Sequence, residues 1–216
     1  MEPSILSLII ESVVKVVFVI GLVMGGVTYM TWVERRVAAI IQDRLGPNRV
    51  GLAGLLQPIA DGLKFLFKED IIPPHVYKPF YLLAPTLIFV PSLLGSTVIP
   101  FGDSINLFGR DIPLRVADLN VGILFIFAMS AMGVYGIALA GWASNNKFSL
   151  MGGLRSSAQL ISYELAMGLS VVGVLMAAGS LRLNDVVEYQ SGFHWNAFFQ
   201  PVGLLCFVVA AFAETN

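Results

Sequence analysis

Residues 119–142 read LNVGILFIFAMSAMGVYGIALAGW and contain no charged side chain. A helix of about 20 mostly apolar residues is long enough to cross the roughly 30 Å hydrocarbon core of a lipid bilayer. This stretch exceeds that length and is not interrupted by Asp, Glu, Lys or Arg. It therefore predicts a transmembrane helix.

The rest of the chain has the same apolar character. Of its 216 residues, 56% are hydrophobic and 12% are charged, whereas soluble domains carry about 25% charged residues. Four further apolar stretches also predict transmembrane helices, at about residues 5–33, 80–101, 158–178 and 198–216. The sequence thus predicts an all-α polytopic membrane protein, with residues 1–216 forming a single transmembrane helical domain of five spans.

Basic residues are distributed unevenly between the connecting segments. Residues 34–79 carry seven Lys or Arg and residues 143–157 carry two, whereas the alternate segments carry only Arg110, Arg115 and Arg182. Cytoplasmic loops of membrane proteins are enriched in Lys and Arg. We therefore expect residues 34–79 to be cytoplasmic and the N-terminus to lie outside.

The cytoplasmic segment also predicts a helix that is too short to span, at about residues 58–68. Pro58 suits a first helical turn, and apolar side chains recur at steps of three and four residues. Asp61 and Lys64 lie on the polar face at ion-pair spacing. We expect this amphipathic helix to lie in the interface on the cytoplasmic side.

A tight turn is predicted just before this helix, at residues 46–49. Gly46-Pro47-Asn48-Arg49 has proline at the second position and, at the third, an asparagine that can adopt a positive φ. A preformed turn beside an amphipathic helix could frame a pocket for an amphipathic ligand.

Three glutamates lie within or beside the apolar stretches, namely Glu34, Glu164 and Glu214. A charge at the bilayer centre costs at least about 2.5–3.5 kcal/mol, so such residues are rare unless they have a function. Glu164 lies inside the fourth predicted span, which favours a role with protons or ions. Glu34 leaves two interpretations open, an interfacial anchor beside Arg35 and Arg36 or a member of a proton path.

Several common types of site are excluded or disfavoured. Cys206 is the only cysteine, which excludes a disulfide within the chain and a four-cysteine zinc or iron–sulfur site. His75 and His194 have no second ligand at metal-binding spacing, so we expect no metal. No glycine pattern for nucleotide binding follows a predicted strand. A net charge of −1 gives no sign of nucleic-acid binding.

Long motifs of the chain match one known family. They are Glu34-Arg35-Arg36, residues 42–51 (QDRLGPNRVG), residues 56–64 (LQPIADGLK), residues 67–70 (FKED), residues 141–147 (GWASNNK), residues 154–159 (LRSSAQ) and Ser162-Tyr163-Glu164. On these motifs the chain resembles the H-subunit family of the proton-translocating NADH:quinone oxidoreductase, respiratory complex I, to which mitochondrial subunit 1 also belongs. The resemblance covers essentially the whole chain.

The resemblance implies a function for each group of residues. It implies a membrane subunit that forms the quinone chamber at the junction with the peripheral arm, with quinone as the substrate. The residues it assigns to that chamber are Arg35, Arg36, Arg44, Arg49, Asp61 and Lys64. It also implies that Glu34, Glu164 and Glu214 belong to a glutamate-lined path for protons or charge.

The resemblance further implies partners and a location. It implies no cofactor on this chain, with FMN and iron–sulfur clusters in partner subunits. Those partners are the peripheral-arm subunits of the quinone site and the other membrane-arm subunits, in a bacterial cytoplasmic (inner) membrane. Because the family continues past residue 216 with an acidic loop and further spans, we expect this chain to be part of a longer protein.

Two alternative functions remain open. Related subunits serve membrane-bound hydrogenases and F420H2 or ferredoxin dehydrogenases, in which the electron donor differs. The intact Gly-Pro-Asn-Arg sequence favours the quinone-reducing enzyme over these. A standalone ion transporter is a remote alternative, because the chain lacks the paired, interrupted spans that such folds usually show.

Overall fold

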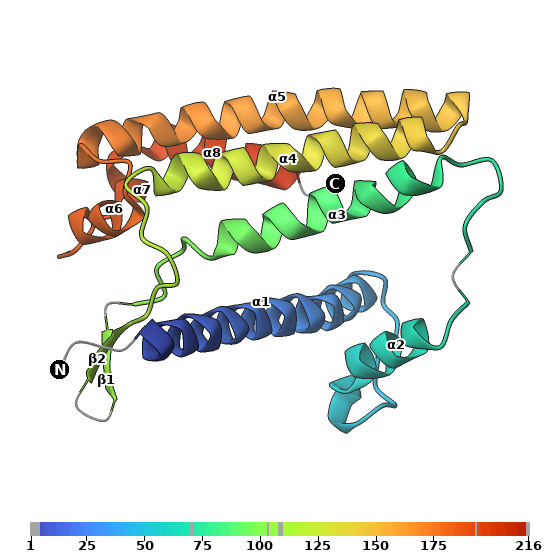
Figure 1. The fold of residues 1–216 in the computed structure, drawn as a ribbon, viewed down its shortest axis with the longest axis horizontal. Helices are drawn as coiled ribbons and strands as arrows, with labels where there is room; N and C mark the ends of the chain where they lie inside the picture. The colour runs from blue at the N-terminus through green and yellow to red at the C-terminus, as the bar shows by residue number, and fades with distance from the viewer. Residues whose placement is uncertain (1–4, 70, 103, 108–109, 193, 215–216) are drawn as a thin grey trace. The chain divides into compact units, whose positions relative to one another are not determined.

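The computed structural model describes residues 5–69, 71–102, 104–107, 110–192 and 194–214. The chain divides into two compact units, Met1–Ile72 and Pro73–Asn216. Each unit is mostly helical (Figure 1).

The first unit contains helix α1 (Ile5–Ile41), a 3₁₀ turn η1 (Leu52–Gly54) and helix α2 (Gln57–Leu66). The predicted first span ends at about residue 33, but α1 continues to Ile41. It stops where Asp43 adopts a left-handed conformation with φ of 50°. The Arg44 amide then donates a 2.9 Å hydrogen bond to the Ala39 carbonyl, which satisfies a carbonyl at the helix end.

Helix α2 occupies nearly the predicted range, Gln57–Leu66 instead of 58–68, with Pro58 buried in its first turn. Proline is favoured there because the first amides of a helix have no partner within the helix. The helix itself is therefore present. Its location at the cytoplasmic membrane surface stays a prediction.

The described residues of the second unit form six helices and two short strands. Their bounds are α3 Lys78–Ser96, β1 Ser104–Leu107, β2 Arg110–Pro113, α4 Gly122–Ala143, α5 Lys147–Ala178, α6 Leu183–Tyr189, α7 Asn196–Phe199 and α8 Pro201–Glu214. Helix α4 packs against α3 and α5, and α8 packs against α5. Figure 1 shows α3, α4 and α5 side by side.

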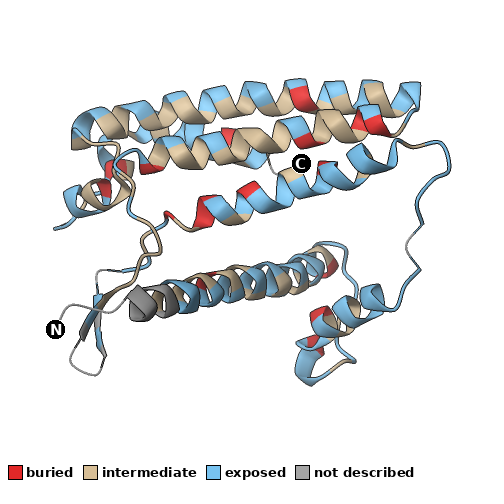
Figure 2. Ribbon diagram, in the orientation of Figure 1, coloured by how far each residue is buried: buried red, intermediate tan, exposed pale blue. Residues whose placement is uncertain are grey.

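Small residues make the contacts between these helices. The buried hydrophobic residues of the described chain are all Ala or Val, and none of its large side chains is fully buried. Figure 2 shows these buried positions separated by long exposed stretches on α3, α4 and α5. At one crossing of α4 and α5, a Cβ atom on Gly153 would lie 3.1 Å from the Cα atom of Gly141. Such packing of small residues, with large apolar residues outward, is typical of helices in a membrane.

Four described helices are long and apolar enough to span a bilayer: Glu11–Ile41, Lys78–Ser96, Gly122–Ala143 and Lys147–Ala178. The chain is therefore an integral membrane protein of the predicted helical class. The fifth predicted span is not confirmed, because residues 198–216 contain a break at Gln200 followed by α8, which has only 14 residues. The outside location of the N-terminus also stays a prediction.

Helix bounds differ from the predicted spans in two more places. Helix α5 begins at Lys147 instead of at about residue 158, because the Asn146 side chain caps it by accepting a 2.9 Å hydrogen bond from the Phe148 amide. Helix α3 ends at Ser96 instead of at about residue 101. Beyond it lies an unpredicted antiparallel hairpin in which Ser104 pairs with Pro113.

The turn between α4 and α5 is held by aromatic side chains and the backbone. Trp142 stacks on Tyr77 with ring centroids 5.4 Å apart, and the Tyr77 amide donates a 2.9 Å hydrogen bond to the Ala143 carbonyl. Asn145 adopts a left-handed conformation with φ of 48°. The motif at residues 141–147 therefore has a structural function, namely to join two long helices and α3 at one end.

Candidate functional site

In the first unit, an ion pair joins α1 to α2. The Arg35 guanidinium donates to the Asp61 carboxylate, and the Gln57 side-chain amide donates to the other Asp61 oxygen at 3.0 Å. The Gln57 hydrogen bond and the Arg35 guanidinium together hold the pKa of Asp61 below its usual range. The predicted pair between Asp61 and Lys64 is not formed, since Asp61 pairs with Arg35 instead.

A second contact joins α1 to the loop before α2. Arg36 Nη1 donates a 3.2 Å hydrogen bond to the Ala53 carbonyl. The same guanidinium lies 5.0 Å from the centre of the Trp32 ring, within the range of a cation–π interaction. Consecutive arginines of α1 thus fix two different elements, Arg35 holding α2 and Arg36 holding the loop.

The loop itself has a different conformation from the predicted turn. Asn48 does not adopt a positive φ; the left-handed residues are Asp43, Gly51, Ala53 and Gly54. Gly54 is buried with φ of 77°, and a Cβ atom there would lie 2.2 Å from the Pro47 carbonyl oxygen. The chain therefore turns back at Gly51–Gly54 and brings that segment against Pro47. The prediction failed because proline and asparagine permit a turn without requiring one.

The remaining predicted residues of this unit are less constrained. Arg44 donates a 2.6 Å hydrogen bond to the nearby Gln42 side chain, and Arg44, Arg49 and Lys64 are all exposed. Glu34 is exposed on α1 and has no ion pair within the described part of the chain. The structure thus brings Arg35, Arg36 and Asp61 into one framework, while the other predicted residues lie on its surface.

In the second unit, two of the predicted glutamates meet. Glu164 on α5 and Glu214 at the end of α8 both line a cavity of about 230 Å³, together with residues of α3 and α4. Ser130 of α4 donates a 3.2 Å hydrogen bond to Glu214 Oε1 and is also a hydrogen-bond partner of Glu164. Both carboxylates are half-buried. Sequence reasoning missed Ser130, because one serine in an apolar helix carries no distinguishing pattern.

Glu164 also lines a larger cavity of about 420 Å³ between α4 and α5. The other lining side chains are apolar, among them Phe127, Ile161 and Leu165. Glu164 therefore stands between a polar cavity shared with Glu214 and an apolar one. A carboxylate in that position is half surrounded by groups that do not solvate charge.

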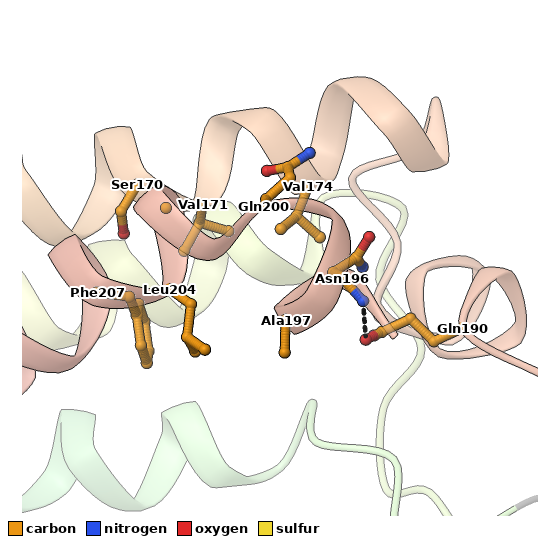
Figure 3. A pocket seen from close by; sticks show the side chains of 10 residues that line it. Ser170, Val171, Val174, Gln190, Asn196, Ala197, Gln200, Leu204 and Phe207 are labelled. Carbon is orange, nitrogen blue, oxygen red and sulfur yellow. Dashed lines mark hydrogen bonds between the residues drawn. The ribbon is translucent and has the colours of Figure 1, made fainter. Parts of the chain in front are cut away.

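A third cavity, of about 300 Å³, lies among α5, α7 and α8 (Figure 3). Its polar residues are Ser170, Gln190, Asn196 and Gln200. Asn196 is 8% exposed, and its backbone amide donates a 3.4 Å hydrogen bond to Gln190 Oε1, whereas its side-chain nitrogen has no partner in the described chain. None of the described residues that line this cavity is charged. It contains none of the residues predicted to be functional.

Charged residues between the helices form a closed cluster elsewhere in the second unit. Asp118 accepts hydrogen bonds from Arg182 and pairs with Arg115 at 3.2 Å, and Arg182 lies 3.7 Å from Asp185. The Arg182 hydrogen bond lowers the pKa of Asp118 and in turn raises the pKa of Arg182. This cluster fastens the loop before α4 to the start of α6.

The described residues contain no group of three or more His, Cys, Asp or Glu side chains placed to hold a metal ion. His194 stacks on Phe199 with ring centroids 6.0 Å apart. The chemistry that these residues offer is therefore acid–base and electrostatic.

Comparison with known proteins identifies the family. The model of the NADH dehydrogenase family matches residues 14–216. The chain belongs to this family. It is similar to the H subunit of NADH-quinone oxidoreductase from Flavobacterium psychrophilum, with 51% identity over 210 residues, which are 97% of this chain and 61% of that protein.

Other relatives in the NADH dehydrogenase family have comparable identity. The protein designated H 1 among the NADH-quinone oxidoreductase subunits of Solibacter usitatus is 52% identical over 216 residues, covering 97% of this chain and 54% of that protein. The protein with the same designation in Geobacter metallireducens is 50% identical over 214 residues, covering 99% of this chain and 64% of that protein. The chain therefore spans less than two thirds of the length of these relatives.

Proposed function

We propose that this chain is the part of a complex I membrane subunit that forms the quinone chamber and begins the proton path. The observation that carries the proposal is its 51% identity, over 97% of its length, to the H subunit of an NADH-quinone oxidoreductase. The activity is NADH:quinone reduction coupled to proton translocation. The redox centres, FMN and iron–sulfur clusters, belong to partner subunits.

The quinone chamber is assigned to the first unit. The Arg35–Asp61 pair and the Arg36–Ala53 hydrogen bond hold the loop and α2 against α1, which gives support for a rigid chamber wall. Arg44, Arg49 and Lys64 are exposed and can meet a partner subunit of the peripheral arm or the quinone headgroup. This arrangement positions a neutral carbonyl compound near cationic donors, which suits a quinone that gains negative charge on reduction.

The proton path is assigned to the glutamates. Glu164 and Glu214 share a cavity and a hydroxyl partner, which supports proton exchange between them. Glu34 is exposed and serves as a third member on the cytoplasmic side. Quinone reduction shifts charge in the chamber, and this shift changes the protonation of the path and drives the neighbouring pumping subunits.

The first test is the composition of the native membrane complex that contains this chain within its full-length protein. Mass spectrometry of the purified complex should find flavin and iron–sulfur subunits of an NADH dehydrogenase. Hydrogenase or F420H2 dehydrogenase subunits in their place would contradict the donor, and recovery of a homo-oligomer would support the transporter.

The proton path is tested by the exchange Glu164→Gln in that complex. We expect the complex to assemble and coupled NADH:quinone reduction to fall at least about tenfold, because the amide cannot take up a proton. Glu188→Gln is the control, since Glu188 is exposed on α6. Unchanged quinone reduction and proton pumping in Glu164→Gln would refute the path.

A further inference from the structure

Ser130 lies between Glu164 and Glu214 as a hydrogen-bonding partner of both. Its hydroxyl comes from α4, whereas the two carboxylates come from α5 and α8. The hydroxyl donates to Glu214 Oε1 at 3.2 Å. This serine therefore links two carboxylates that lie on different helices.

A serine hydroxyl has a single hydrogen and two lone pairs, and an ionised carboxylate can only accept hydrogen bonds. Two ionised carboxylates would compete for that single hydrogen and would repel each other in a medium of low dielectric constant. The arrangement is fully satisfied when one carboxyl carries a proton. Protonated Glu164 then donates to Ser130 Oγ, while the Ser130 hydroxyl donates to ionised Glu214.

Other serines of the spans do not have this arrangement. Ser92 lines the same cavity, but its hydroxyl donates a 2.8 Å hydrogen bond to the Phe89 carbonyl in its own helix. Ser162 and Ser170 likewise donate to carbonyls of α5, at 2.9 Å and 2.6 Å. Such bonds within a helix are the usual way for a serine in an apolar segment to satisfy its donor. Ser130 instead donates to a carboxylate of another helix.

We propose that the Ser130 hydroxyl relays a proton between Glu164 and Glu214. The Glu164 O–H bond breaks as a new bond forms to Ser130 Oγ, and the original Ser130 O–H bond breaks as its hydrogen bonds to Glu214 Oε1. The serine is neutral before and after, and one negative charge moves from Glu214 to Glu164. No electron is transferred, so no further reactant is required.

The cavity around these groups allows the relay to reset. After one transfer the hydroxyl hydrogen points toward Glu164, and it must rotate before the next proton passes in the same direction. The cavity of about 230 Å³ has room for several water molecules, since one water needs on the order of 10–15 Å³ of such space. The hydroxyl therefore has space in which to rotate. The inference rests on the proton path proposed above and adds the residue that connects two of its members.

The test compares Ser130→Thr with Ser130→Val in the full complex in membrane vesicles. Threonine and valine have nearly the same shape, but only threonine has a hydroxyl. We expect Ser130→Thr to keep coupled quinone reduction and pumping within about twofold of the unchanged protein, and Ser130→Val to lose at least about tenfold. Ser92→Ala, at the same cavity, should have no effect on either rate.

The series distinguishes the relay from the proton path as a whole. Loss in Glu164→Gln together with full activity in Ser130→Val would overturn the relay and leave the path standing. Full activity in Glu164→Gln would overturn the path. Equal loss in Ser130→Thr and Ser130→Val would also overturn the relay, because it would show that the position requires a small side chain and not a hydroxyl.

An infrared measurement keeps the proposal testable if Ser130→Val does not assemble. The carbonyl band of a protonated carboxylic acid depends on its hydrogen bonds, so the redox-induced difference spectrum should change in Ser130→Ala and not in Ser92→Ala. The band to follow is the one that Glu164→Gln removes. An identical band in Ser130→Ala and the unchanged protein would overturn the relay.

Discussion

The exchange Gly54→Ala tests whether the loop at residues 42–56 forms part of the quinone chamber. An alanine at this position meets two separate penalties. The φ of Gly54, 77°, is in the left-handed region, which costs a residue with a Cβ atom about 1–2 kcal/mol. The added Cβ atom would also lie 2.2 Å from the Pro47 carbonyl oxygen and 2.5 Å from its carbon.

The second penalty is the larger one. Carbon and carbonyl oxygen atoms normally approach to about 3.3 Å, so the Pro47 carbonyl and the new methyl group must separate by about 1 Å. Both atoms are on or next to the backbone and cannot move by a rotamer change. The whole loop from Pro47 to Gly54 must shift, and with it the Ala53 carbonyl that accepts from Arg36. A misplacement of about 1 Å in a reacting site can reduce activity by about 100-fold.

The assay is quinone-dependent NADH oxidation by the assembled complex at several quinone concentrations. We expect Gly54→Ala to lower kcat/KM for quinone by about 10- to 100-fold, while NADH oxidation with an artificial acceptor, which does not need the chamber, is retained. The control is Gly62→Ala, because Gly62 lies within α2 and a Cβ atom there meets nothing within 4 Å. Equal quinone kinetics for both variants would refute the assignment of this loop to the chamber.

Two further predictions concern the second unit. The Asp118 carboxylate, held ionised by Arg182, adds stability above its unfolded pKa of about 3.9, and that stability is lost as the pH falls through its lower folded pKa. Asp118→Asn should therefore lower the thermal midpoint by about 2–4 °C at pH 7 and by less near pH 3, and a deficit that grows toward acid would contradict this sign. Gly153→Ala should destabilise the α4–α5 contact by about 1–3 kcal/mol, because its Cβ atom would lie 3.1 Å from Gly141 Cα, whereas Gly152→Ala meets nothing within 4 Å. Thermal inactivation should separate these neighbouring variants, and equal midpoints would show that the two helices are not in close contact there.

The helices were predictable because their signal is continuous over many residues. A charge-free stretch such as residues 119–142 leaves a membrane helix as the natural interpretation, and α4 occupies Gly122–Ala143. The bounds were less predictable, since a helix continues wherever residues favour it and ends where a cap forms. Arg35 and Arg36 ended the apolar stretch but not the helix, and Asn146 began α5 well before its apolar part.

The candidate site was predictable in its members but not in its pairs. Composition and resemblance both pointed to Arg35, Arg36 and Asp61. The spacing of Asp61 and Lys64 on one helix suggested a local ion pair, yet the partner of Asp61 is Arg35, far away in the sequence. Helical spacing identifies residues that are able to meet, but a contact between two helices depends on where the intervening loop turns. That turn depends on the left-handed glycines at Gly51–Gly54, not on an asparagine.

The partners of each carboxylate separate structural acids from acids that can carry protons. Asp61 and Asp118 each accept hydrogen bonds from an arginine, and this lowers the pKa of each carboxyl. An acid held in this way stays ionised at neutral pH and fixes elements in place, but it is unsuited to take up a proton.

Glu164 and Glu214 have no cationic partner within the described ranges, and they share the Ser130 hydroxyl instead. A hydroxyl can accept from a protonated carboxyl as readily as it donates to an ionised one, so it supports either protonation state. Proton transfer requires two such states of similar free energy on neighbouring groups. The same carboxyl chemistry therefore serves as a fastener at Asp61 and Asp118 and as an exchangeable site at Glu164 and Glu214, and the difference comes from which donor each carboxyl meets.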